Sequence, residues 1–181
     1  MTKPIWIAPL LLAIVGCNTA APPKPVVEMP KDTIRVEPGA VDQDAPEEYT
    51  TTESGLKYRI RRKSDGAKPD PESVIRLHYR GTLLNGQIFD TSYGKTGQAA
   101  VFPLGSLIKG WQEGLLLTSE GGMIELEIPP ELGYGNREMG PIPPNSTLHF
   151  IVELIEIMKY NPPPGSGAKA PAAPDQPVSP H

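Results

Sequence analysis

The stretch Val74-Ile-Arg-Leu-His-Tyr-Arg-Gly81 decides which kind of fold this chain can form. Apolar and polar residues alternate along it, so an extended strand has one apolar face, which carries Tyr79. The segment Leu148-His-Phe-Ile-Val-Glu-Leu154 alternates in the same way, as do shorter runs at residues 56–61 and 124–128. Many strand signals with little helical periodicity predict an antiparallel sheet.

Two further signals predict a turn and a helix. The residues Leu84-Asn-Gly-Gln87 predict a tight hairpin of type I′, because Asn-Gly accepts the positive φ angles that this turn requires. A short helix is predicted after Ser106, which suits the N-cap position. Ile108, Trp111 and Leu115 follow on one face of that helix. A sheet that curls around the helix must enclose Trp111 on its concave side.

Composition excludes several classes of function. Only three of the 181 residues are histidine and one is cysteine, which is too few for most metal and thiol chemistries. His78 and His149 fall on outward positions of the predicted strands, so we expect no metal site. No basic patch with interleaved aromatics indicates a nucleic acid partner. No glycine-rich phosphate loop is present either, and no cofactor is expected.

Residues 1–16 resemble a bacterial signal peptide. Lys3 supplies a positive charge, and residues 5–15 form an apolar run. That run is too short to cross a bilayer as a helix, which needs about 20 residues. It ends in Ile14-Val-Gly-Cys17, which resembles the lipobox of bacterial lipoproteins, where the cysteine is lipidated. The alternative is an ordinary cleavage site with a chance cysteine beside it.

A lipobox implies a lipid anchor on Cys17 and therefore a membrane as one partner. Because Asn18 follows the cysteine, the resemblance favours the outer membrane of the cell envelope, with the protein facing the periplasm. Residues 17–50 are rich in proline and acids and have no apolar period, so we predict a flexible linker. The proline- and alanine-rich residues 161–181 predict a disordered tail, and the folded domain is expected to span residues 51–160.

Motifs spread over this expected domain resemble the FKBP-type peptidyl-prolyl cis–trans isomerases, particularly the secreted bacterial members. In chain order they are Thr52-Glu-Ser-Gly-Leu-Lys-Tyr58, His78-Tyr-Arg-Gly81, Gly86-Gln-Ile-Phe-Asp90, Phe102-Pro-Leu104, Ile108-Lys-Gly-Trp111, Ile128-Pro-Pro-Glu-Leu-Gly-Tyr-Gly135 and Ile142-Pro-Pro-Asn-Ser-Thr-Leu148. Each motif alone is a weak signal, but their order and spacing together are specific. The resemblance implies an α+β fold in which an antiparallel half-barrel sheet wraps around one short α-helix.

The resemblance also implies the positions of a substrate pocket. Trp111 is expected to form its floor. The expected walls are Tyr79, Phe89, Leu107, Ile108, Ile142 and Phe150. Asp90 and Tyr134 are expected to supply polar groups at the rim, and the backbone N–H of Ile108 is expected to bind a substrate carbonyl. Many eukaryotic members carry an aromatic residue where this chain has Ala100, a departure that bears on macrolide affinity more than on catalysis.

The implied function is isomerisation of X-Pro bonds in unfolded or partly folded proteins of the cell envelope, with a macrolide as a candidate ligand. The alternative is a membrane-tethered chaperone or partner-binding module that uses the same pocket with little catalysis. Asp90 either acts on substrate or braces Tyr79, and these two roles stay open. The proline-broken residues 18–48 cannot form the helical dimerisation arm of larger secreted relatives, so a monomer is expected.

Overall fold

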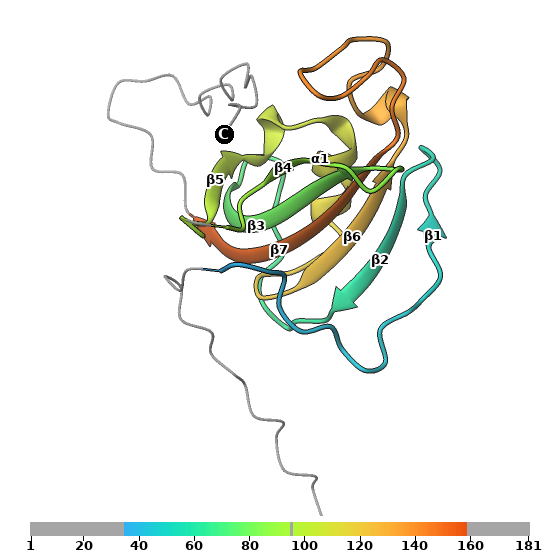
Figure 1. Cartoon of the computed structure of the whole chain (residues 1–181). Coiled ribbons are helices and arrows are strands. Elements are labelled where there is room, and N and C mark those ends of the chain that lie inside the picture. The colour runs from blue at the N-terminus through green and yellow to red at the C-terminus, as the bar shows by residue number, and fades with distance from the viewer. Residues whose placement is uncertain (1–34, 95, 159–181) are drawn as a thin grey trace, which may run out of the picture.

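The computed structural model describes residues 35–94 and 96–158, which form a curved sheet with one short helix on one side (Figure 1). Its strands are β1 (Thr50–Thr51), β2 (Lys57–Arg62), β3 (Val74–Leu83), β4 (Ile88–Thr91), β5 (Ala100–Pro103), β6 (Met123–Ile128) and β7 (Leu148–Met158). Its helix is α1 (Lys109–Leu115), and the short 3-10 turns are η1 (Leu104–Ser106) and η2 (Pro130–Leu132). The expected signal peptide, Cys17 and the expected tail lie outside the described residues. No helix within these residues is long and apolar enough to cross a membrane.

All strand pairs in the described part of the chain are antiparallel. They make one seven-stranded sheet in the order β1-β2-β6-β7-β3-β4, and β5 also pairs with β3. The longest pair joins β3 to β7, from Val74 opposite Met158 to Leu83 opposite Leu148. This arrangement confirms the predicted antiparallel α+β fold with one short helix.

Helix α1 packs closely against strand β6 because two of its residues have no side chain. A Cβ atom added to Gly110 would lie 2.5 Å from Cγ2 of Ile128, and one added to Gly114 would lie 2.6 Å from Cδ2 of Leu126. Glycine costs a helix about 1 kcal/mol relative to alanine. Here it permits a close approach, which buries Leu115 and most of Trp111 against the sheet.

Two local predictions were wrong in detail. Ser106 does not cap α1: its hydroxyl donates to the Pro103 carbonyl at 2.6 Å, while Ile108 holds the N-cap position without a side-chain hydrogen bond. The β3–β4 turn is not of type I′, since Gly86 has a positive φ of 83° but Asn85 does not. The amide of Gly86 donates to the Leu83 carbonyl, as expected for a type I turn followed by a glycine bulge.

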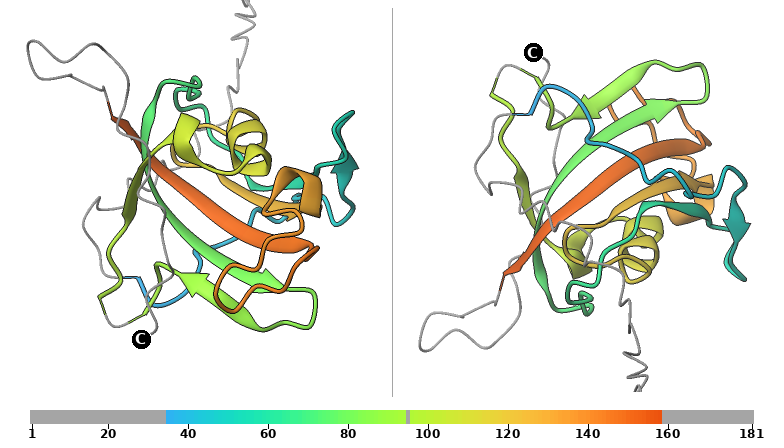
Figure 2. Two further views of the ribbon diagram at one scale, coloured as in Figure 1. Left: turned by 90° about the horizontal axis from the view of Figure 1, so that it is seen from above. Right: turned by 90° about the horizontal axis from the view of Figure 1, so that it is seen from below.

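The described part of the expected linker packs against the folded domain. Residues 35–49, which we call the strap, cross the face of the sheet opposite α1 (Figure 2). The amide of Asp42 donates to the Arg61 carbonyl at 2.8 Å, and the amide of Lys63 donates to the Asp42 carboxylate at 2.8 Å. The strap has no apolar periodicity because polar contacts, rather than a hydrophobic face, hold it in place.

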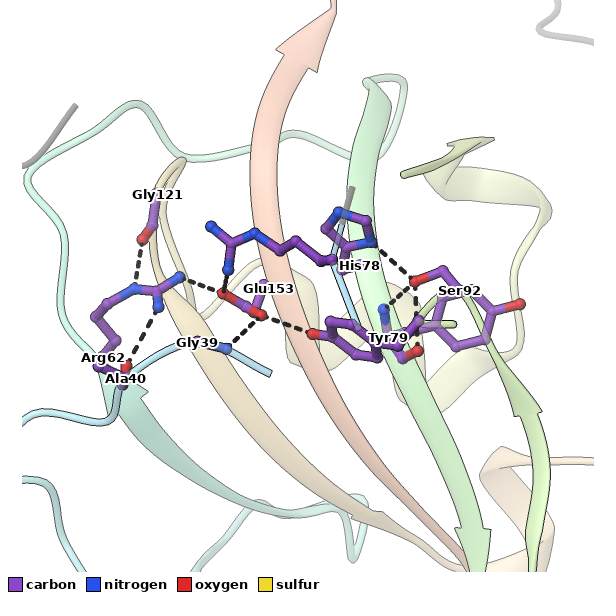
Figure 3. Close-up of polar contacts among 10 residues, drawn as sticks. Gly39, Ala40, Arg62, His78, Tyr79, Ser92, Gly121 and Glu153 are labelled. Carbon is purple, nitrogen blue, oxygen red and sulfur yellow. Dashed lines mark hydrogen bonds and ion pairs between the residues drawn. The ribbon is translucent and has the colours of Figure 1, made fainter. Parts of the chain in front are cut away.

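A buried carboxylate holds the first half of the strap (Figure 3). Glu153 on β7 is 1% exposed and accepts four hydrogen bonds. The donors are the hydroxyl of Tyr93 at 2.6 Å, the Arg62 guanidinium at 2.8 Å, the Gly39 amide at 2.9 Å and the Arg35 guanidinium at 3.1 Å. Burial alone would raise the pKa of Glu153, but these donors outweigh it and lower that pKa. Two of the donors belong to the strap.

His78 lies on the face of the sheet that the strap crosses, and it is buried there. Its side chain points to that face, as predicted, yet it is only 2% exposed because the face is covered. The ring stacks on Tyr93 with centroids 5.2 Å apart, and Nδ1 lies 3.1 Å from the Ser92 hydroxyl. Burial lowers the pKa of His78. This histidine is therefore part of the packing beneath the strap.

A second buried carboxylate holds the end of the strap. Glu125 on β6 accepts hydrogen bonds from Arg59 at 2.6 Å and from His149 at 2.7 Å. Although burial raises the pKa of Glu125, these two partners lower it to about 2. The hydroxyl of Tyr49 lies 3.1 Å from Nε2 of His149, and the Arg59 guanidinium stacks 4.6 Å above the Tyr49 ring. Tyr49 thereby fixes the strap where it enters β1.

We predict that the strap contributes to the stability of the folded domain. A fragment of residues 51–160 should be about 2–4 kcal/mol less stable than a fragment of residues 35–160, because Glu153 loses the Arg35 and Gly39 donors and the face beneath the strap loses its cover. Urea denaturation of the two fragments measures the difference. Equal unfolding midpoints would show that the strap does not stabilise the sheet.

Candidate functional site

The concave face of the sheet carries a cup of aromatic side chains around Trp111. The Trp111 ring meets Phe150 of β7 and Tyr79 of β3 edge to face, with centroids 5.0 Å and 5.4 Å away. Phe102 of β5 lies 6.4 Å from Trp111 and 6.2 Å from Tyr79, again edge to face. Phe89 of β4 packs on Phe150 at 5.4 Å. Edge-to-face packing holds each ring in one orientation, so the cup is rigid as well as apolar.

Gly81 makes room for one wall of this cup. A Cβ atom there would lie 2.6 Å from the Phe89 ring and 2.7 Å from the Phe150 ring. These distances are well below van der Waals contact, so any side chain at this position would push the two rings apart. The glycine at the end of the His78-Tyr-Arg-Gly81 motif is therefore a packing requirement of the cup.

Asp90 is the charged member of the cup within the described residues. Its carboxylate accepts a hydrogen bond of 2.6 Å from the hydroxyl of Tyr79 on the neighbouring strand. Burial of the ring, and then the Asp90 carboxylate, raise the pKa of Tyr79 far above its ordinary value. Tyr79 therefore remains a neutral donor, and Asp90 is held in place by it. This geometry supports the bracing role and leaves the second carboxylate oxygen available.

Tyr134 and Ile108 form the edge between the cup and an adjoining pocket. The pocket has a volume of about 470 Å³. One side is formed by the start of α1 and the residues just before it, and the other side by the loop that follows β6. Its lining consists of Ser106, Leu107, Ile108, Lys109, Pro130, Glu131, Gly133, Tyr134, Gly135 and Arg137. Burial and the negative charge of Asp90 raise the pKa of Tyr134, which Arg137 partly opposes. Tyr134 thus lies within electrostatic reach of Asp90.

Two polar groups at this edge have no hydrogen-bond partner among residues 35–94 and 96–158. They are the Tyr134 hydroxyl and the Ile108 backbone N–H. The indole N–H of Trp111, which is buried, also has none in this part of the chain. Unpaired donors beside an apolar cup are suited to a ligand that carries carbonyl groups.

The structure brings the predicted site residues together in three groups. Trp111, Phe150, Phe89, Tyr79 and Asp90 are joined by ring contacts or by a hydrogen bond. Leu107, Ile108 and Tyr134 line the pocket, and Ile142 is buried in the same apolar cluster as Trp111. These positions are compatible with the expected roles, which stay predictions.

Sequence reasoning missed one member of the cup. Phe102 belongs to a quoted motif, and its alternation with Val101 along β5 would have identified it as inward-facing. In the loop after Tyr134, Arg137 lines the pocket, whereas Met139 packs on the core and pairs with Ile142. Glu138 is exposed and lies outside the pocket lining.

We predict that two Tyr→Phe substitutions distinguish the hydroxyl that holds Asp90 from the hydroxyl that has no partner in the described residues. Tyr79→Phe should lower the free energy of unfolding by about 1 kcal/mol, because Asp90 loses its donor. Tyr134→Phe should change it by less than about 0.5 kcal/mol, because that hydroxyl has no partner within the described chain. Chemical denaturation of both variants measures this, and an equal effect would contradict the assignment of the Tyr79–Asp90 pair.

The profile of one protein family, FKBP-type peptidyl-prolyl cis-trans isomerase, matches residues 66–155. The FKBP-type peptidyl-prolyl cis-trans isomerase FkpA of Buchnera aphidicola is 49% identical over 106 residues, which are 59% of this chain and 42% of that protein. The FKBP-type 22 kDa peptidyl-prolyl cis-trans isomerase of Escherichia coli is 44% identical over 120 residues, 65% of this chain and 58% of that protein. The chain therefore spans about half the length of these curated relatives.

Solved structures show the same similarity. The crystal structure of FkpA from Escherichia coli superposes with a TM-score of 0.59 at 41% identity, covering 62% of this chain and 52% of that one. The crystal structure of AtFKBP13 superposes with a TM-score of 0.57 at 36% identity, covering 61% of this chain and 99% of that one. With the fold, the aromatic cup and these matches in agreement, the chain belongs to the FKBP-type peptidyl-prolyl cis-trans isomerase family.

Proposed function

We propose that the protein catalyses cis–trans isomerisation of X-Pro peptide bonds in unfolded or partly folded proteins. One observation carries this function: a rigid aromatic cup around Trp111, bordered by two hydrogen-bonding groups without partners in the described chain. A proline ring is a compact apolar group that fits such a cup. The carbonyls on either side of the proline are acceptors for donors at its edge.

The chemistry requires no nucleophile, metal or proton shuttle. Rotation about a peptide bond faces a barrier of about 18–20 kcal/mol because amide resonance must be broken. The twisted amide has lost that resonance and is less polar than the planar amide. A dry apolar cup therefore favours the twisted form relative to water, which is differential binding of the transition state. Each tenfold acceleration needs about 1.4 kcal/mol, so a few kcal/mol are sufficient.

Each residue has a distinct part in this mechanism. Trp111 supports the proline ring, and Phe150 and Tyr79 hold the indole in position from two sides. The Ile108 N–H and the Tyr134 hydroxyl donate to substrate carbonyls and hold one end of the substrate while the bond turns. Asp90 orients Tyr79 through their hydrogen bond and sets a negative potential at the rim. Ala100 has a smaller side chain than the aromatic residue that many eukaryotic members carry at this position. The difference bears on the affinity of the cup for a macrolide.

We predict that the protein accelerates exchange of an X-Pro peptide and that Tyr134→Phe lowers kcat/KM by about two- to tenfold, since one hydrogen bond to substrate is lost. NMR exchange spectroscopy on a short peptide measures both. Tyr58→Phe is the matched control, because Tyr58 packs on the core and neither shares a ring contact with the cup nor lines the pocket in the described residues. If the folded protein binds the peptide without accelerating its exchange, the binding-module alternative replaces the enzyme.

We also propose a location for this activity. Residues 1–17 support a lipoprotein of the cell envelope, anchored through Cys17 in the outer membrane and facing the periplasm. Stable anchoring through Cys17 would require two or more acyl chains, because one acyl chain binds membranes only marginally. The support comes from sequence alone, since Cys17 lies outside the described residues.

We predict that the wild-type protein fractionates with membranes and that Cys17→Ser abolishes fatty-acid labelling and lipoprotein processing. The folded domain is unchanged in this variant, so its isomerase activity should persist. Mass spectrometry of the mature N-terminus is the direct measurement. An unmodified Cys17 in the mature protein would contradict the anchor.

A further inference from the structure

The pocket beside the cup is lined by charged side chains that do not pair with one another. Lys109 lies at the start of α1, and Glu131 and Arg137 lie on the loop after β6. Within the described part of the chain, none of these three side chains makes an ion pair or a hydrogen bond. On the opposite face of the sheet, by contrast, Arg59, Arg61 and Arg62 all pair with buried carboxylates.

We propose that this pocket is a subsite for the residues next to the substrate proline, and that Lys109 and Arg137 make it selective for an acidic side chain there. This specificity rests on the isomerase function proposed above. The substrate class that follows is an X-Pro segment with Asp or Glu beside the proline.

Continuity with the cup is the first step in the argument. Ile108 and Tyr134 belong both to the edge of the cup and to the lining of the pocket. A polypeptide advances about 3.3 Å per residue when extended, so a chain whose proline occupies the cup places its neighbouring side chains directly at this pocket. Lys109 immediately follows Ile108 in sequence, and Arg137 lies three positions after Tyr134.

Charge gives the direction of the selectivity. Two cations and one carboxylate line the pocket, so its net charge is positive (2 − 1 = +1). The charge of Arg137 also acts at the rim, where it partly offsets the effect of the Asp90 carboxylate on the pKa of Tyr134. Glu131 weakens the field and should repel an acidic substrate. An exposed ion pair changes an equilibrium only modestly, so the preference should be a matter of a few fold.

Matched peptides and single charge changes test the subsite. Peptides that differ only in Glu or Gln, placed once before and once after the proline, are compared by kcat/KM in NMR exchange experiments at low ionic strength. The Glu peptide should be favoured about two- to fivefold in at least one position, and salt should reduce this ratio. Arg137→Gln should bring the ratio toward one, Arg137→Glu should invert it, and Glu131→Gln should increase it.

Lys68→Gln is the matched control, because it removes one positive charge from an exposed position outside the pocket. It should leave the Glu-to-Gln ratio unchanged. Equal turnover of Glu and Gln peptides at both positions would overturn the subsite while leaving the isomerase function standing. A change with Lys68→Gln as large as that with Arg137→Gln would overturn it as well. If no peptide is isomerised, the proposed function fails and the specificity fails with it.

Discussion

The close contact between α1 and β6 is the constraint on which the site depends. Gly110 and Gly114 bring the helix axis so near to the sheet that Ile128 and Leu126 occupy the space where side chains would stand. Trp111, which lies between them in the helix, is thereby pressed into the concave face. A larger residue at either glycine would lift the indole away from Tyr79 and Phe150, whose edges now fix it. The floor of the cup is therefore set by two residues that contribute no atoms to it.

The two faces of the sheet carry side chains of different kinds. Its concave face holds apolar and aromatic side chains, with Asp90 tied to Tyr79 at the rim. Its other face holds Glu125 and Glu153, each buried and each paired with arginine. Buried carboxylates are costly unless their hydrogen bonds are satisfied, and the strap supplies part of that satisfaction. Glu125 and Glu153 lie on the far face, so Asp90 is the charged side chain of the cup within the described residues, and the rest of the cup is apolar or aromatic.

Alternation and motif spacing predicted the sheet, the single helix and most of the cup, because each depends on local periodicity or on a residue type that packing demands. The strap could not be predicted in this way. Some of its contacts join residues more than 100 positions apart, such as Arg35 and Glu153, and the contacts that hold it are polar rather than apolar. Proline and acids in residues 17–50 suggest flexibility, and the buried partners of residues 35–49 cannot be inferred from that composition. The burial of His78 was missed for the same reason, since the strand pattern shows its face but not what covers that face.

The cup and the charged pocket are under different packing constraints. Cup residues contact one another, so a change in one of them disturbs its neighbours, as the space around Gly81 shows. Arg137 and Glu131 are exposed on a loop, and their side chains make no polar contact within the described residues. Loop positions of this kind accept substitution without loss of the fold. Under the proposed function, the packed cup residues would support the proline, while the exposed charged residues of the loop would select the sequence around it.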